Sequence, residues 1–138
     1  MSGLVLDCSV AVSWCFEDEA APEIDALLET VRDEGAIVPT LWHLEVANVL
    51  VMAERRGRLS AADTAARLHL LGELPVDTDD GTAHRAWAET IALARAQHLT
   101  AYDAAYLELA MRKGLPLATK DGDLAAAARR SGVKTLPA

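Results

Sequence analysis

Four acidic residues lie where a parallel sheet could use them for chemistry: Asp7, Glu45, Asp103 and Asp121. Asp7 directly follows the short apolar run 4–6, which is typical of a strand buried on both faces. Glu45 and Asp103 fall in the early turns of expected helices, and Asp121 follows the expected strand 115–119. Ligands of open parallel sheets bind at the carboxyl ends of the strands. The pattern therefore predicts that these four carboxylates gather at one edge of the sheet.

Gathered carboxylates repel one another, and a hard divalent cation removes that repulsion. Mg²⁺ prefers a few carboxylates together with waters. An all-oxygen site with one or two Mg²⁺ ions can activate water and stabilise an in-line displacement at phosphorus. The chemistry that best matches the four acids is therefore phosphodiester hydrolysis. Each acid also has a simpler interpretation, because Asp7 can cap a helix, Asp103 and Asp121 can serve a helix dipole, and Glu45 can be a surface residue.

Apolar runs and helical periodicities alternate along the chain, and this alternation predicts an α/β domain with a mostly parallel sheet. We expect one domain over residues 1–138, an open sheet of four to five short strands flanked by helices. Strands are expected at 4–6, 36–38, 74–76, 115–119 and 133–136. Helices are expected at 22–34, 40–56, 60–71, 83–98, 102–113 and 123–130.

Several details of these elements can be tested. Thr40 is expected to cap the helix that carries Glu45, and Ser60 with Asp63 resembles a capping box. The helix 83–98 is expected to place Trp87, Ile91 and Ala94 on one face, after a turn at 79–82.

Length and composition limit the class of protein. A chain of 138 residues fits one domain, and with 51% hydrophobic residues it can form a core without disulfides or structural metals. Cys8 and Cys15 lie in or beside apolar runs, so we expect reduced core thiols. No apolar run approaches the length of a membrane span and no signal peptide is visible, so a cytoplasmic location without membrane contact is expected.

The net charge of −8 has the wrong sign for holding nucleic acid by bulk electrostatics. A nucleic-acid role would need bound metal ions, a partner or a local basic patch, and the acidity leaves room for a basic partner. A basic cluster at a helix end, Arg55, Arg56 and Arg58, either favours the helix dipole or lines an RNA path together with other basic residues. Those other residues are Arg112, Lys113, Lys120, Arg129 and Arg130.

The order of the motifs resembles that of PIN-domain ribonucleases, specifically the VapC-like toxins of type II toxin–antitoxin systems. The resemblance covers essentially the whole chain. It begins with Leu-Val-Leu-Asp-Cys-Ser at 4–9 and continues with Leu-Glu-Val-Ala-Asn-Val-Leu at 44–50. Its most specific parts are Tyr-Asp-Ala-Ala-Tyr at 102–106 and Ala-Thr-Lys-Asp at 118–121. Cys8 is a mild departure, because a small residue usually follows the first acid.

The resemblance implies a function and a set of site residues. Asp7, Glu45, Asp103 and Asp121 would be the catalytic acids that bind Mg²⁺, for which Mn²⁺ could substitute. Supporting roles would fall to Ser9, Asn48, Thr119 and, as a weaker candidate, Asp123. The resemblance further implies an endoribonuclease that acts on RNA as the toxin of a toxin–antitoxin pair, forms a homodimer and is inhibited by a cognate antitoxin protein.

Three other functions remain open. A phosphoacceptor signalling domain would want an acidic pair after the first strand, where only Asp7 stands. A phosphatase with Asp7 as nucleophile would usually have a second Asp at the position of Ser9. A catalytically inert PIN-fold binding module is the third alternative, although all four acids are present.

Overall fold

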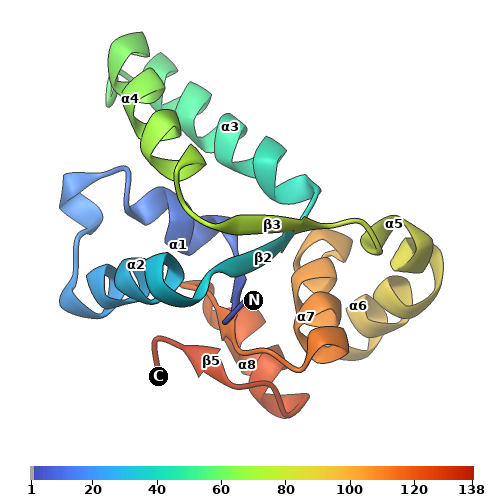
Figure 1. Cartoon of the computed structure of the whole chain (residues 1–138). Coiled ribbons are helices and arrows are strands. Elements are labelled where there is room, and N and C mark those ends of the chain that lie inside the picture. Colours follow the sequence, from blue (N-terminus) through green and yellow to red (C-terminus); the bar gives the residue numbers. More distant parts are fainter. Residues whose placement is uncertain (1) are drawn as a thin grey trace.

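The computed structural model describes residues 2–138. Its centre is a five-stranded sheet in the order β3-β2-β1-β4-β5, and every neighbouring pair of strands is parallel (Figure 1). The strands are β1 (Val5–Leu6), β2 (Ala36–Pro39), β3 (Val76–Asp79), β4 (Leu117–Ala118) and β5 (Thr135–Leu136). The predicted fold class, an open parallel sheet of short strands flanked by helices, is confirmed.

Helices connect successive strands and pack around the sheet. The first half of the chain contributes α1 (Cys8–Ser13), the 3₁₀ turn η1 (Glu17–Glu19), α2 (Pro22–Glu34), α3 (Leu41–Arg55) and α4 (Ala61–Gly72). The second half contributes α5 (Thr82–Arg85), the π-helical turn η2 (Ala86–Thr90), α6 (Ile91–Gln97), α7 (Ala101–Lys113) and α8 (Gly122–Arg130). Figure 1 shows α3 and α4 side by side, projecting away from the sheet, while α5 and α6 lie beside α7.

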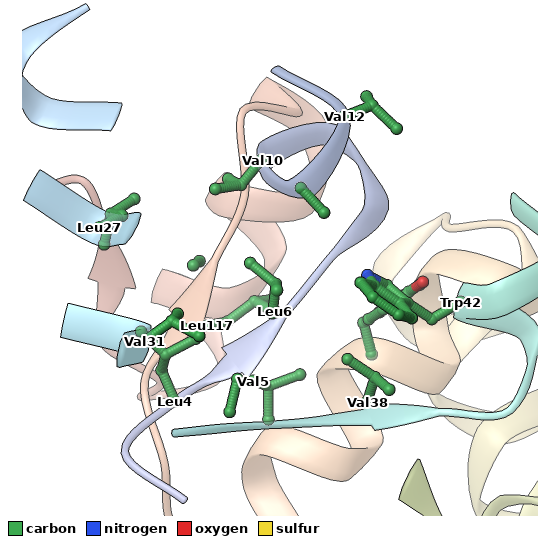
Figure 2. Packing of buried hydrophobic residues seen from close by; sticks show 14 of the residues in the cluster. Leu4, Val5, Leu6, Val10, Val12, Leu27, Val31, Val38, Trp42 and Leu117 are labelled. Carbon is green, nitrogen blue, oxygen red and sulfur yellow. The ribbon is translucent and has the colours of Figure 1, made fainter. Parts of the chain in front are cut away.

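The middle of the sheet is fully enclosed. Leu4, Val5 and Leu6 have no exposed surface, and they belong to one hydrophobic cluster that includes residues of α2, α3, α7 and β4 (Figure 2). Helix α7 is buried continuously from Ala104 to Ala110. A strand that is buried on both faces has a continuous run of apolar residues. This explains why polar and apolar residues do not alternate in β1. The same burial makes β1 and α7 rigid supports for the acids that they carry.

Most helix ends follow local chemistry. The Ser60 hydroxyl accepts a hydrogen bond from Asp63 N at 3.0 Å, and the Asp63 carboxylate accepts one from Ser60 N, so the expected capping box is confirmed. Gly35 ends α2 with φ of 77°, a conformation that favours glycine. Thr40 does not cap α3 with its side chain, so that expectation is wrong. Its backbone is already helical (φ −59°, ψ −30°), whereas a capping side chain normally needs an extended backbone.

The helix expected over 83–98 forms, but its predicted apolar face, with Trp87, Ile91 and Ala94, is wrong. The π-helical turn at 86–90 inserts extra backbone and changes the direction in which side chains point. Trp87 is consequently 93% exposed, while Thr90 is the buried residue of this turn. The edge strand also begins later than expected, at Val76 rather than Leu74, and it runs to Asp79. Among residues 2–138, no helix combines the length and apolarity required to cross a bilayer.

Candidate active site

Asp7 lies at the carboxyl end of β1 and is only 5% exposed. Its Oδ1 atom accepts hydrogen bonds from Ser9 Oγ at 2.6 Å and from Val10 N at 3.1 Å. The bond from Val10 N makes Asp7 the N-cap of α1. The simple capping role and a place in an acidic site are therefore compatible, because a carboxylate has about four lone-pair sites and the cap uses only one of them.

The loop after β4 is joined directly to Asp7. Thr119 Oγ1 donates a hydrogen bond to Asp7 Oδ2 and accepts one from Asp121 N at 3.0 Å. Ser9 Oγ accepts a hydrogen bond from Lys120 N at 2.8 Å. Because β1 and β4 are neighbouring parallel strands, their carboxyl ends bring these residues together across 112 positions of sequence. Thr119 and Ser9 thus orient Asp7 and the segment 119–121 relative to each other.

Glu45 lies on α3, one turn after the end of β2. Its Oε1 atom accepts a hydrogen bond from the hydroxyl of Tyr106, which is on α7 and almost completely buried. The sequence predicted Tyr106 within the helix 102–113 and gave it no role in the site. The spacing of three residues between Asp103 and Tyr106 could have indicated it, because side chains at i and i+3 share one face of a helix.

Asp103 and Asp121 both lie at helix N-termini. Thr100 Oγ1 accepts a hydrogen bond from Asp103 N at 3.1 Å and caps α7, which leaves the Asp103 side chain in the first turn. Asp121 caps α8, and its Oδ1 atom accepts hydrogen bonds from Asp123 N and Leu124 N. Each of these acids is stabilised by a helix N-terminus, as the simpler interpretation expected.

A cavity of about 390 Å³ joins these four separate positions. Its wall includes all four predicted acids, from the end of β1, from α3, from the start of α7 and from the loop after β4. The lining residues are Asp7, Cys8, Ser9, Val12, Glu19, Glu45, Val49, Asp103, Tyr106, Lys120 and Asp121. The structure therefore brings together the four acids that the sequence singled out.

Three acids of this cavity, Asp7, Glu45 and Asp103, have pKa values above those of free carboxyl groups. Burial, and next the negative charge of Asp121, raise the pKa of Asp103. Burial is also the main cause that raises the pKa of Asp7 and of Glu45, with the charge of Asp103 adding to both. Hydrogen bonds from Ser9, Thr119 and Tyr106 oppose these increases in pKa. Asp103 is thus electrostatically coupled to each of the other three acids.

The donor chemistry of the cavity fits a hard cation. Four carboxylates line the same cavity, and a divalent ion would relieve the repulsion among them. Among residues 2–138, no three His, Cys, Asp or Glu side chains are placed so that together they could hold a metal ion.

The supporting residues differ in their positions. Ser9 lines the cavity and Thr119 contacts Asp7, as described above. Asn48 is exposed, lies outside the cavity lining, and makes no side-chain hydrogen bond within the described chain. Asp123 is also outside the lining, although its charge contributes to the raised pKa of Asp103. Cys8 lines the cavity, and burial followed by the charge of Glu45 raises its pKa to about 12, so its thiol stays protonated.

Two further side chains of the cavity lay outside the four-acid prediction. Glu19 lies in the 3₁₀ turn η1 and was not among the predicted site residues, and Lys120 donates a hydrogen bond to it at 3.2 Å. Arg112, which the sequence proposed for an RNA path, lies elsewhere. It forms ion pairs with buried Asp79 at 2.8 Å and buried Glu108 at 2.9 Å, and these bonds fix it within the fold.

The fold and the cavity together define a class: an α/β domain with carboxylates gathered at the carboxyl ends of a parallel sheet. The PIN domain family matches residues 4–130, and the chain belongs to this family. The resemblance inferred from its motifs is thereby confirmed at the level of the family. PIN domains are generally nucleases, so membership supports a hydrolase role.

Solved structures with the same fold cover nearly the whole chain. PAE2754 from Pyrobaculum aerophilum is 24% identical, with a TM-score of 0.71, and the match covers 98% of this chain and 91% of that one. FitAcB from Neisseria gonorrhoeae is 17% identical, with a TM-score of 0.62 and coverage of 96% and 95%. At these identities the likeness establishes the fold alone. The comparison with curated proteins found no match.

Proposed function

We propose that the protein is a Mg²⁺-dependent endoribonuclease, with Asp7, Glu45, Asp103 and Asp121 as its catalytic acids. The observation that carries this proposal is the single cavity lined by all four. Burial, and after it the charge of Asp103, raise the pKa of Asp7 and of Glu45, and such shifts in a shared cavity are typical of functional sites. Membership in the PIN family supports the same chemistry.

The side chains divide the work by position. Asp7, held by Ser9 and Thr119, and Glu45, held by Tyr106, present oriented carboxylates that need little rearrangement. Asp103 and Asp121 complete the ligand set from two helix N-termini. Bound there, Mg²⁺, or Mn²⁺ in its place, would activate water and neutralise charge at the scissile phosphate.

A nuclease assay on the purified chain tests the proposal. Mixed-sequence RNA should be cut in Mg²⁺ or Mn²⁺ and left intact in excess EDTA. Asp7→Asn and Asp103→Asn should each abolish cleavage while the far-UV circular dichroism stays native. Asp25→Asn is a matched control, because Asp25 is also a first-turn acid but lies on α2, outside the cavity. Full activity in EDTA, or in either cavity variant, would reject the proposal.

The same assay separates the alternatives. A catalytically inert PIN-fold module would bind RNA or protein without metal-dependent cleavage. A phosphoacceptor domain would incorporate label from a small-molecule phosphodonor, and a phosphatase would hydrolyse phosphomonoesters rather than internal RNA linkages. Sequencing the RNA ends produced by the active chain would then identify the RNA target, because recognition depends on unpaired bases and shape.

We further propose that the chain acts as the toxin of a toxin–antitoxin pair. The motif resemblance to VapC-like toxins supports this role, and the net charge of −8 suits a basic antitoxin. Large apolar side chains are exposed on the projecting helices α3 and α4, with Leu44 at 76% and Leu70 at 55%. A groove between these helices, lined by Trp42, Val46, Leu68 and Leu71, gives a partner an apolar surface.

Co-purification and growth tests address the partner. Tagged protein should recover a short basic or DNA-binding protein from its native host, and expression of the chain alone should arrest growth. Harmless expression with no such partner recovered would reject the toxin role without affecting the nuclease proposal. The homodimer that the resemblance implies should appear as twice the chain mass in light scattering of the purified protein.

A further inference from the structure

We propose that Lys120 is the residue that contacts an RNA phosphate at the acidic cavity, and that Glu19 holds it when RNA is absent. This inference rests on the proposed ribonuclease function. Among the described residues that line the cavity, Lys120 alone carries a positive charge. An acidic cavity repels the phosphates of its substrate, so one positive side chain at its wall has a large local effect.

The backbone of Lys120 is held firmly while its side chain can move. Lys120 N is hydrogen bonded to Ser9 Oγ, and both neighbouring residues belong to the hydrogen-bond network around Asp7. The side chain is 34% exposed, and its partner Glu19 is 31% exposed. Ion pairs with this exposure contribute little to stability, so the Lys120 ammonium group can exchange Glu19 for a phosphate without a large penalty.

The surroundings place this pair on the route into the cavity. A second hollow, lined by Ala21, Thr119, Gly122 and Arg129, adjoins the acidic cavity. Glu19, Lys120 and Asp121 line both hollows. A strand of RNA that lies across the acids and continues into the second hollow therefore passes the Glu19–Lys120 pair.

The acidic turn itself is held in place from the other side. Arg58 contacts Asp18 at 3.1 Å and Glu19 at 3.8 Å, and its guanidinium group lies 4.1 Å from the centre of the Phe16 ring. Glu19 therefore keeps a positive partner when Lys120 leaves it. Two other basic residues suggested for an RNA path are less available, since Arg112 is in a buried ion-pair network and Arg130 donates a hydrogen bond to Gln97.

Binding of a labelled mixed-sequence RNA to the Asp103→Asn protein, measured by fluorescence anisotropy, tests the contact without cleavage. Lys120→Ala in this background should weaken binding by roughly five- to tenfold. It should also reduce the slope of log Kd against log salt by about 0.7, the value expected for one phosphate contact on a single strand. Lys120→Arg should restore both. Lys134→Ala removes an equal charge far from the cavity and should change neither.

Glu19 provides the second measurement. Glu19→Gln should tighten RNA binding more than Glu17→Gln does, by up to about fivefold, because Glu17 has no ion pair within residues 2–138. In a protein that already carries Lys120→Ala, the advantage of Glu19→Gln should disappear. In the cleaving protein, Lys120→Ala should raise KM with little change in kcat, as for a contact made equally before and during reaction.

The outcomes are separable from those of the nuclease proposal. Equal binding by the Lys120→Ala and Lys134→Ala proteins, or no loss of salt slope, overturns the Lys120 inference even if the chain cleaves RNA. Absence of metal-dependent cleavage by the wild type rejects the ribonuclease proposal, whereas the binding series still decides whether Lys120 contacts phosphate. Native circular dichroism of each variant confirms that the comparison is between folded proteins.

Discussion

The hydroxyl of Thr119 donates a hydrogen bond to Asp7 Oδ2, joining the carboxyl ends of β4 and β1 across 112 positions of sequence. Both side chains are buried, and the same hydroxyl accepts a hydrogen bond from Asp121 N. One side chain thus orients the first acid of the cavity and fixes the backbone of the last. Ser9 makes a parallel connection between Asp7 and Lys120 N, so this end of the site is held by two hydroxyl groups.

Thr119→Val tests this connection with almost no change of shape. The variant leaves a buried carboxylate without one donor, and such a loss costs about 1–3 kcal/mol of unfolding free energy. RNA cleavage in Mg²⁺ should fall as well, because Asp7 and Asp121 lose their common support. Thr30→Val, on the exposed face of α2, should change stability by less than about 0.5 kcal/mol in the same urea titrations. Equal stability of the two variants would show that the hydrogen bond is unimportant.

Tyr106→Phe removes the hydroxyl that supports Glu45 and keeps the buried ring. Because this hydrogen bond lowers the pKa of Glu45, its loss should raise that pKa further. If ionised Glu45 is needed for activity, the acidic limb of the pH–rate profile should move to higher pH, and the rate near neutral pH should fall. Tyr102→Phe, which alters an exposed tyrosine next to Asp103, should leave the limb in place. An unchanged limb in Tyr106→Phe would remove the hydroxyl from the proposed site.

Asp103→Asn should reveal the repulsion among the acids. Without metal, the variant should be as stable as the wild type or more stable by about 1–2 kcal/mol, because it removes the charge coupled to the other three acids. Mg²⁺ should raise the melting temperature of the wild type by binding the folded state, and much less that of the variant. A purely structural first-turn acid predicts the reverse, a destabilised variant and a flat Mg²⁺ response. Asp25→Asn provides that structural reference in thermal melts at constant ionic strength.

The raised pKa values of the cavity acids give the pH dependence of stability a definite sign. Asp7, Glu45 and Asp103 have folded-state pKa values above their values in the unfolded chain. The folded protein therefore binds protons more tightly, and these groups stabilise it most below their unfolded pKa values. Their contribution is lost as the pH rises through the folded pKa values. Metal-free unfolding titrations should show this loss in the wild type, less of it in Asp103→Asn, and Mg²⁺ should reduce it.

Arg112→Met tests a separate ion-pair network, whose contribution to stability depends on pH in the opposite direction. Hydrogen bonds from Arg112 lower the pKa of Asp79, so their stabilisation is present above the unfolded pKa and is lost as the pH falls through the folded value. At pH 7 the variant leaves Asp79 buried without its partner and leaves Glu108 with only the longer contact to Arg85 at 3.8 Å, which costs about 3–5 kcal/mol. The difference from the wild type should shrink as the pH falls and Asp79 protonates. Arg32→Met, which breaks an exposed pair with Glu29, should cost less than about 1 kcal/mol.

The sequence alone determined the class of fold and the four candidate acids. Apolar runs such as 4–6 indicate buried strands, because polar and apolar residues do not alternate in a strand that is buried on both faces. Acids that follow such runs are placed at the carboxyl ends of the strands, where parallel topology brings them together. Local patterns were also sufficient for the capping box at Ser60 and Asp63 and for the end of α2 at Gly35.

Tertiary structure decided the partners of these acids and which side of one helix is buried. The bonds of Tyr106 to Glu45, Thr119 to Asp7 and Lys120 to Glu19 join residues 61, 112 and 101 positions apart, and no local pattern specifies such pairs. The π-helical turn at 86–90 exposes Trp87 and buries Thr90, because packing against α7 overrides the regular period of 3.6 residues. Spacing along the chain limits which faces can meet, but only the packed sheet and helices determine which side chains touch.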